Sequence, residues 1–98
     1  MNINIKKEAS SALVSLEGRL DTSTAPELEN SLKTVYDGIT SLVFDFAKLE
    51  YVSSAGLRVL LAAQKTMNKV GSMVLKNVDP SIIEIFEITG FIDILTIE

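Results

Sequence analysis

The spacing of apolar residues changes several times along this chain, and these changes constrain its fold more than any other sequence feature. Residues 2–7 and 12–17 alternate apolar and polar side chains, which is typical of half-buried strands. Because only a short polar break at residues 8–11 separates them, we expect an antiparallel hairpin, with Gly18 ending the second strand. Residues 28–36 and 54–69 instead repeat apolar side chains with the spacing of two amphipathic helices.

The remaining segments continue an alternation of strands and helices. Residues 42–46 form an apolar run broken by one acid, which predicts a strand covered on both faces, and residues 72–76 predict another strand. Asp79 and Pro80 predict the start of a third helix that ends at Gly90, and residues 91–98 predict a last short strand. The expected fold is therefore α/β: a single domain over residues 1–98, in the order β-β-α-β-α-β-α-β, whose mixed sheet has helices packed on it.

Composition excludes several classes of function. The net charge of −4 argues against a nucleic-acid partner held through its phosphates, and no apolar run is long enough to cross a bilayer. The chain has no cysteine and no histidine, so it lacks thiolate chemistry, the commonest general base and the commonest metal ligand. We therefore expect a cytoplasmic protein that is not an enzyme, binds no cofactor or metal, and inserts into no membrane.

Two loops carry polar residues where a strand leads into a helix. In the first loop, Thr24 and Glu27 have the spacing of a capping box, and Pro26 suits the first helical turn. Asp21 precedes that cap, and two interpretations stay open for it: a turn-forming aspartate or a contact for another molecule. The second loop leads into the helix at residues 54–69. Because both loops follow strands, we expect them at the same edge of the sheet, where α/β proteins bind their ligands.

Ser53 and Ser54 open the second helix, and capping rules distinguish them. If Ser53 is the N-cap, Val52 and Leu57 form a hydrophobic staple, whereas a cap at Ser54 would pair Ser53 with Arg58, which cannot pack in that way. Ser53 is therefore predicted to cap the helix with its side-chain oxygen. Ser54 becomes the first helical residue, with a free hydroxyl near the positive end of the helix dipole.

These residues alone leave the function of Ser54 open. A helix N-terminus offers backbone donors to a phosphate, and the small residues Ala55 and Gly56 would let another protein approach closely. Gly56 lowers the helix propensity by about 1 kcal/mol relative to alanine, which indicates that close approach or packing matters there. Two capping serines without a further function are an equally good interpretation at this point.

Three segments of the sequence carry a pattern that extends beyond the second loop: residues 52–61 read VSSAGLRVLL, residues 18–21 read GRLD, and residues 86–91 read FEITGF. In these segments the chain resembles the bacterial anti-sigma factor antagonists, the stand-alone members of the STAS domain family. The resemblance extends over essentially the whole chain and implies a single STAS-like domain. It also implies that the phosphorylated position is Ser54, two residues before Gly56. Many family members carry aspartate where this chain has Ser53, which preserves a cap but removes a negative charge beside the hydroxyl.

The resemblance further implies a partner-switching mechanism. The unphosphorylated chain would bind an anti-sigma factor, a serine kinase with a histidine-kinase-like ATPase fold, and thereby free its sigma factor. Phosphorylation of Ser54 by that kinase would reverse the binding, and a PP2C-type phosphatase would restore it. The expected partner-binding residues come from both loops: Asp21, Thr22, Ser53, Ser54, Ala55, Gly56, Leu57 and Arg58.

Other functions are less well supported. A serine hydrolase would need a histidine to activate its nucleophile, and a phospho-acceptor receiver domain would need an acidic cluster that this chain lacks. One alternative stays open: a STAS subunit of a lipid-transporting ABC system, which the sequence separates poorly from an anti-sigma factor antagonist.

Overall fold

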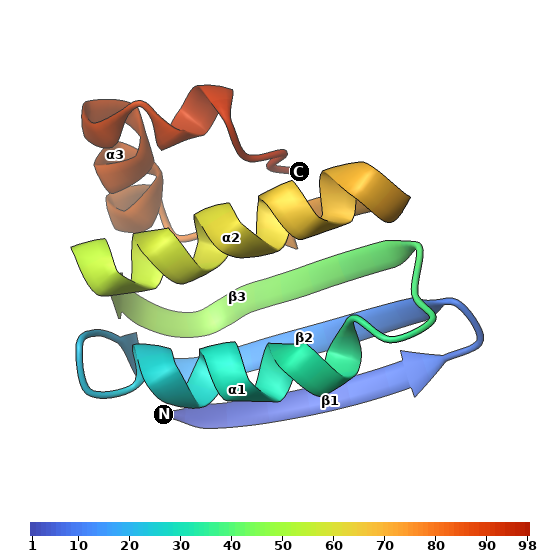
Figure 1. Ribbon diagram of the computed structural model, residues 1–98. Coiled ribbons are helices and arrows are strands. Elements are labelled where there is room, and N and C mark those ends of the chain that lie inside the picture. The colour runs from blue at the N-terminus through green and yellow to red at the C-terminus, as the bar shows by residue number, and fades with distance from the viewer.

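The elements follow the expected alternation as far as the third helix (Figure 1). The structure is a computed structural model that describes residues 1–98. Its elements are β1 (Asn2–Glu8), β2 (Ser11–Leu20), α1 (Ala25–Val35), β3 (Ser41–Val52), α2 (Ser54–Val70), β4 (Ser72–Lys76) and α3 (Pro80–Thr89). The strands pair in the order β1-β2-β3-β4, with β1 antiparallel to β2 and the other pairs parallel. The predicted hairpin and the predicted mixed sheet of a single α/β domain are both confirmed.

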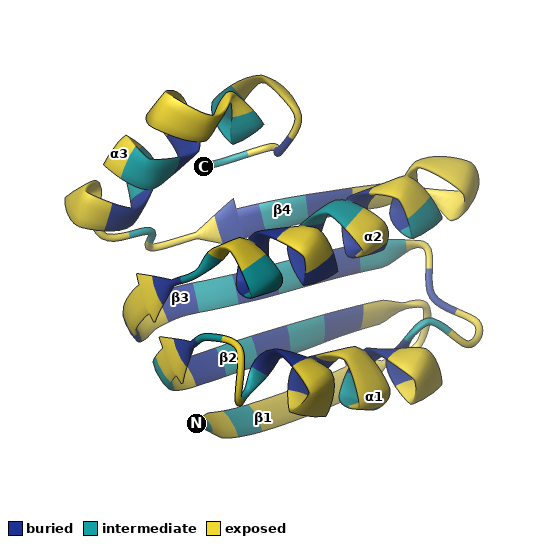
Figure 2. Ribbon diagram, turned by 60° about the vertical axis from the view of Figure 1, so that its left-hand side comes forward, coloured by how far each residue is buried: buried dark blue, intermediate teal, exposed yellow.

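Helices α1 and α2 cover the same face of the sheet, as Figures 1 and 2 show. The crossovers from β2 to β3 and from β3 to β4 step in the same direction, so right-handed connections place both helices on one side. Burial along β3 alternates accordingly: Leu42, Phe44 and Phe46 are buried, whereas Val43 and Asp45 are only half-buried. The expectation that this strand is covered on both faces is therefore wrong.

The core fills the space between the covered face of the sheet and the helices. The predicted stripe of α1 is buried at Leu28, Leu32 and Val35. Phe44 from β3 and Phe86 from α3 are fully buried, so α3 is held to the core although it lies beyond β4 in Figure 2. Burial of such a large apolar side chain contributes about 1.5–3 kcal/mol to folding.

Strand β2 does not end at Gly18 as the sequence predicts. Gly18 has φ +107°, and the pairing of β2 with β3 shifts register between Gly18 and Arg19 before it resumes at Arg19, which lies opposite Tyr51. Glycine adopts this backbone conformation at little cost, so it forms an irregularity within the strand instead of ending it. The fully buried Leu20 side chain anchors the continuation in the core.

The chain after α3 also differs from the expectation, because residues 91–98 do not form a strand. Gly90, at φ +80°, ends α3 and leads into a 3-10 helix, η1 (Phe91–Asp93). Backbone hydrogen bonds from Ile94 and Leu95 to the Phe91 oxygen continue that turn and allow Leu95 to be buried. Only one parallel bridge, between Leu75 and Ile97, then joins this segment to β4.

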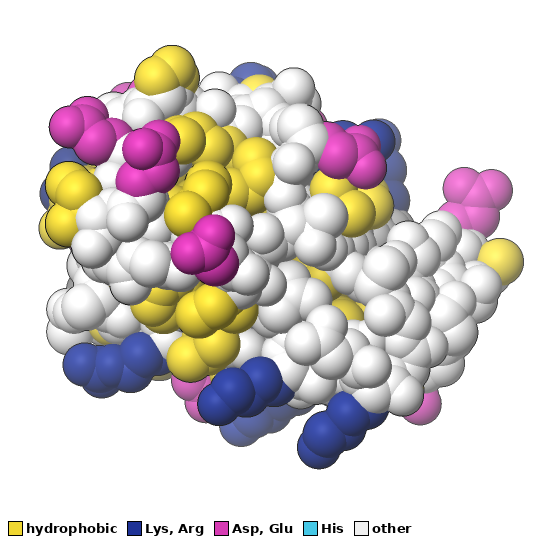
Figure 3. All heavy atoms as spheres, turned by 90° about the horizontal axis from the view of Figure 1, so that it is seen from above, with side chains coloured by type: hydrophobic (Ala, Val, Ile, Leu, Met, Phe, Trp, Pro, Cys, Tyr) yellow, Lys and Arg dark blue, Asp and Glu magenta, His cyan; other side chains and the backbone are white.

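Apolar side chains stay uncovered around α3 and η1. Ile88 is 79% exposed and Ile94 is 46% exposed. In Figure 3, which views the molecule from above, hydrophobic side chains gather on the surface with acidic side chains around them, and the most prominent basic side chains lie along the lower border of the view. None of the helices has both the length and the apolar character that crossing a membrane requires.

Candidate functional site

The carboxyl ends of β2 and β3 meet at one edge of the sheet. Leu20 pairs with Val52 at the last position of the two strands, and the Ser53 N–H donates to the Leu20 oxygen at 2.8 Å. The loop at residues 21–24 and the first turn of α2 therefore begin side by side, as the order of the elements predicts.

Ser53 occupies the N-cap position of α2, as the capping rules predict. Its backbone is extended, at φ −90° and ψ 176°, and its Oγ accepts a hydrogen bond from the Gly56 N–H at 3.4 Å. Its carbonyl oxygen accepts the first helical hydrogen bond, from the Leu57 N–H at 2.9 Å. Val52 and Leu57 are both part of the buried core, which is consistent with the predicted staple.

The length of this capping hydrogen bond sets the expected cost of removing it. Ser53→Ala should lower the free energy of unfolding by about 0.5 kcal/mol, the low end of the range for capping residues, because 3.4 Å is long for a hydrogen bond. Ser53→Asp should retain the full stability, since aspartate caps as well as serine. Urea denaturation followed by circular dichroism would measure both. A loss above about 2 kcal/mol for Ser53→Ala would show that Ser53 does more than cap.

Ser54 is the first residue of α2, and its side chain is exposed. Its hydroxyl forms no hydrogen bond within the protein, in contrast to the capping hydroxyl of Ser53. As a first-turn residue, Ser54 also has a backbone N–H without a partner inside the helix. The hydroxyl is thus free to react or to bind without disturbing the fold.

Asp21 forms the turn that connects β2 to α1. Its Oδ1 accepts hydrogen bonds from the Ser23 hydroxyl at 2.8 Å, the Ser23 N–H at 3.0 Å and the Thr24 N–H at 3.2 Å. The bond from the Ser23 hydroxyl, supported by these backbone donors, holds the pKa of the Asp21 carboxyl below its usual range. The turn is therefore favoured while Asp21 is ionised and weakens only as the pH falls through that lowered pKa. Of the two interpretations left open for Asp21, the structure shows the turn-forming one.

The predicted capping box of Thr24 and Glu27 is absent. Thr24 is the N-cap of α1, but its backbone is already helical at φ −102° and ψ −21°, and its side chain makes no capping bond. The Thr24 hydroxyl instead donates to the Arg19 oxygen at 2.7 Å and accepts from the Asp21 N–H at 2.8 Å. The Ala25 N–H donates to the Asp21 oxygen at 2.8 Å, so the Asp21 turn supports the start of α1.

Gly56 and Leu57 were expected to contact a partner, but both are buried. A Cβ added at Gly56 would lie 2.7 Å from Leu20 Cγ and 3.0 Å from the Leu20 oxygen. Glycine is thus required there because α2 packs closely against the end of β2, and not because another protein must approach. Leu57 points into the core. Gly56 and Leu57 are therefore not part of the surface that a partner can contact directly.

The other predicted site residues are accessible. Thr22, Ser54 and Arg58 are exposed, while Asp21, Ser53 and Ala55 are half-buried. A groove of about 200 Å³ runs between the N-terminal turns of α1 and α2 and is lined by Thr22, Ala55 and Arg58, with Glu29 on the α1 side. The structure therefore brings the two predicted loops together around one groove.

Arg19 and Tyr51 add a contact at this edge that the sequence did not predict. The Arg19 guanidinium lies 4.4 Å from the centre of the Tyr51 ring, and its Nε is 3.9 Å from Asp21 Oδ2. Such a cation–π contact at an exposed site contributes about 0.5–1 kcal/mol. The pair forms because the register shift after Gly18 places Arg19 opposite Tyr51, and no local sequence pattern signals such a shift.

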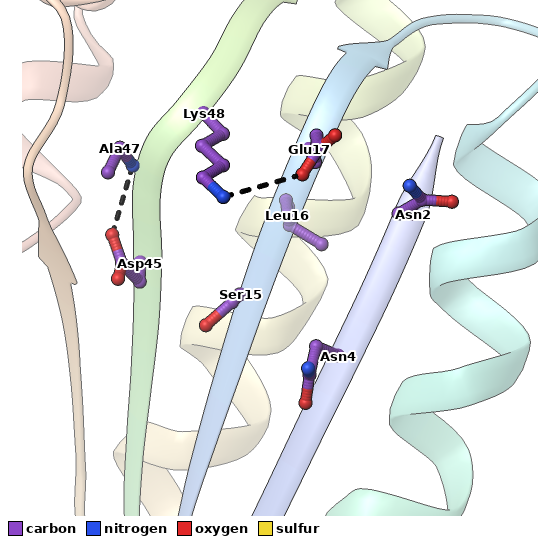
Figure 4. A pocket seen from close by; sticks show the side chains of 8 residues that line it. All are labelled: Asn2, Asn4, Ser15, Leu16, Glu17, Asp45, Ala47 and Lys48. Carbon is purple, nitrogen blue, oxygen red and sulfur yellow. Dashed lines mark hydrogen bonds and ion pairs between the residues drawn. The ribbon is translucent and has the colours of Figure 1, made fainter.

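A separate hollow of about 420 Å³ lies on the open face of the sheet (Figure 4). It is lined by Asn2, Asn4, Ser15, Leu16, Glu17, Asp45, Ala47 and Lys48. Its charged side chains are engaged with one another or with the backbone: Lys48 Nζ is 3.8 Å from Glu17 Oε2, and Asp45 Oδ1 accepts from the Ala47 N–H at 2.9 Å. The one hydroxyl that lines the hollow, that of Ser15, comes from the middle of β2 and not from the start of a helix, so we place the candidate site at the edge formed by β2 and β3.

Comparison with known proteins identifies the family to which this fold belongs. A model of the STAS domain matches residues 2–98. The protein BtrV of Bordetella bronchiseptica is 35% identical over 99 residues, which cover 99% of this chain and 85% of BtrV. The anti-sigma-B factor antagonist of Bacillus subtilis is 30% identical over 98 residues, which cover 99% of this chain and 90% of that protein.

Solved structures share the same fold. The Bacillus cell fate determinant SpoIIAA in its phosphorylated form matches with a TM-score of 0.77, covering 99% of this chain and 91% of that one at 18% sequence identity. The identity is low, so this match is a likeness of fold. Together with the family model and the sequence relatives, it shows that this chain belongs to the STAS domain family.

Proposed function

We propose that this chain is an anti-sigma factor antagonist whose binding to its partner is switched by phosphorylation of Ser54. One observation carries the proposal: the Ser54 hydroxyl is exposed and unbonded at the first position of α2, while Ser53 occupies the cap. The name of the Bacillus subtilis relative and the two forms of SpoIIAA, unphosphorylated and phosphorylated, support a function of this kind.

In its unphosphorylated form, the edge formed by β2 and β3 would bind the anti-sigma factor. The exposed side chains of Thr22, Ser54 and Arg58 can contact the partner directly, and the small side chain of Ala55 allows close approach. A phosphate on Ser54 would add about −1.5 to −2 charges to a chain whose net charge is already −4. Placing that charge in a desolvated interface opposes binding, and no refolding is needed because the Ser54 hydroxyl takes no part in the fold.

The chain would act as a substrate in this cycle and not as an enzyme. The anti-sigma factor, a serine kinase with a histidine-kinase-like ATPase fold, would transfer the γ-phosphoryl group of ATP to Ser54 Oγ and release ADP. A PP2C-type phosphatase would then hydrolyse the phosphate ester with water and return the free hydroxyl. Neither step asks this chain to supply a catalytic base, which suits a protein without histidine.

Phosphorylation of matched serine variants tests the assignment. Ser54→Ala should gain no phosphate from the cognate kinase and ATP, yet should still bind the partner, because it removes only an unbonded hydroxyl. Ser53→Ala is the matched control and should still be phosphorylated. Intact-mass spectrometry would measure the phosphate. If Ser54→Ala is phosphorylated and Ser53→Ala is not, the assignment is wrong.

Capture of partners distinguishes this proposal from the transporter alternative. Unphosphorylated wild-type protein and Ser54→Asp would each be used as bait, and the recovered proteins identified. A kinase recovered by the wild type but not by Ser54→Asp supports the partner switch. A permease and its ATPase recovered by both would instead support a STAS subunit of a lipid-transporting ABC system.

A further inference from the structure

We propose that Arg58 binds the phosphate once Ser54 is phosphorylated, an inference that rests on the proposed function. Arg58 follows Ser54 by four residues on α2, so the two side chains are neighbours on the same face of the helix, with their Cβ atoms about 6 Å apart. Side chains of a helix lean toward its N-terminus, which directs Arg58 back over the first turn. Its position in the groove beside Ala55 and Thr22 agrees with this direction.

The Arg58 guanidinium is free to take a new partner. The ion pairs of the chain are Arg19 with Asp21, Lys48 with Glu17, and Lys76 with Glu98, and none of them includes Arg58. Glu29 faces the same groove from α1 without approaching Arg58 within ion-pair distance. Guanidinium groups bind phosphate through two parallel hydrogen bonds, so a phosphate on Ser54 would be a stronger partner than the distant Glu29 carboxylate.

The second cation at this edge is less available. Arg19 lies over the Tyr51 ring at 4.4 Å and pairs with Asp21 at 3.9 Å. Moving Arg19 to the phosphate would give up both contacts, whereas moving Arg58 gives up none. The structure thus favours Arg58, and not Arg19, as the ligand of the phosphate.

This contact changes how phosphorylation would act on binding. Before phosphorylation, the exposed Arg58 can pair with a carboxylate of the partner across the interface. After phosphorylation, the neighbouring phosphate takes Arg58 within the same chain. Phosphorylation would therefore add a repulsive charge and also withdraw a cation from the partner, so two changes at one turn of α2 act in the same direction.

A titration of the phosphate tests the contact without any kinase. Phosphoserine would be incorporated at position 54 during synthesis, and its second pKa followed by phosphorus-31 NMR. Because Arg58 favours the dianion, this pKa should lie below the ordinary value of about 6 in the otherwise wild-type chain. Arg58→Ala should raise it by about half a pH unit, a threefold change in proton affinity, and Arg58→Lys should raise it by less.

Lys65→Ala provides the matched control on the same helix. Lys65 is exposed and lies about 16 Å along α2 from position 54, so its removal should leave the pKa of the phosphate unchanged. An unchanged pKa in Arg58→Ala would overturn the proposal, as would an equal rise in Lys65→Ala. A rise confined to the Arg58 variants supports it whether or not a kinase modifies Ser54, so the phosphorylation assay above reports separately on the proposed function.

Discussion

Ser54→Asp is expected to weaken binding of the anti-sigma factor about a hundredfold, a loss of about 2.7 kcal/mol. The substitution places a carboxylate at an exposed position that would be desolvated in the complex, where an unpaired charge costs several kcal/mol. The melting temperature should change little, because the Ser54 side chain makes no hydrogen bond in the fold. Isothermal titration calorimetry against the purified partner would measure the affinity.

Ser53→Asp is the matched control for that experiment, since it adds the same charge one residue earlier. An aspartate at the N-cap would bind the first-turn N–H group that Ser53 Oγ binds now, so its charge is directed toward the helix. We expect the affinity of Ser53→Asp to stay within a few-fold of wild type. Equal weakening by the two substitutions would contradict the switch, because the effect would then come from added charge at this edge and not from the position of Ser54.

Gly71→Ala is expected to lower the free energy of unfolding by about 3 kcal/mol, the upper end of the usual cost of overpacking. A Cβ at Gly71 would lie 1.8 Å from the Thr40 oxygen and 2.6 Å from the Thr40 carbonyl carbon. That oxygen also accepts a hydrogen bond from the Ser72 N–H at 2.9 Å, at the point where β4 begins beside β3. Relief of the clash must therefore move backbone that starts a strand pair, and chemical denaturation would report the loss.

Gly38→Ala separates this clash from a general effect of replacing glycine. Gly38 has φ +77°, and nothing lies within 4 Å of an added Cβ, so only backbone strain of about 1 kcal/mol is expected. A loss for Gly71→Ala no larger than that for Gly38→Ala would show that the Thr40 carbonyl does not cause the requirement for glycine.

Local sequence patterns predicted most of the elements and the chemistry of the second loop. Alternating residues identified β1 and β2 as a hairpin, the helical spacing identified α1 and α2, and Asp79 with Pro80 identified the start of α3. Capping rules separated Ser53 from Ser54 because the interactions that define a helix start lie within a few residues of one another. The same rules wrongly predicted a capping box at Thr24, because its hydroxyl bonds to the backbone of Arg19 and Asp21, which lie outside the helix.

Contacts between distant residues decided the rest. The sequence predicted that Gly18 ends β2, yet pairing with β3 and burial of Leu20 carry the strand on. It also predicted a strand over residues 91–98, where burial of Leu95 instead favours a turn.

The sequence alone predicted that Ser54 is the first residue of α2 and has a free hydroxyl, whereas the surroundings of Ser54 were decided by the tertiary structure. Gly56 was noticed as an unusual first-turn residue, but only the packing of α2 on Leu20 shows why it must be glycine. Likewise, only the register of β2 against β3 places Arg19 over the Tyr51 ring. That Arg58 takes part in no ion pair can be seen only from the positions of all the charged side chains in the folded chain. The physical reason is that helix starts depend on neighbours in sequence, whereas register, close packing and ion pairing depend on residues that only the folded chain brings together.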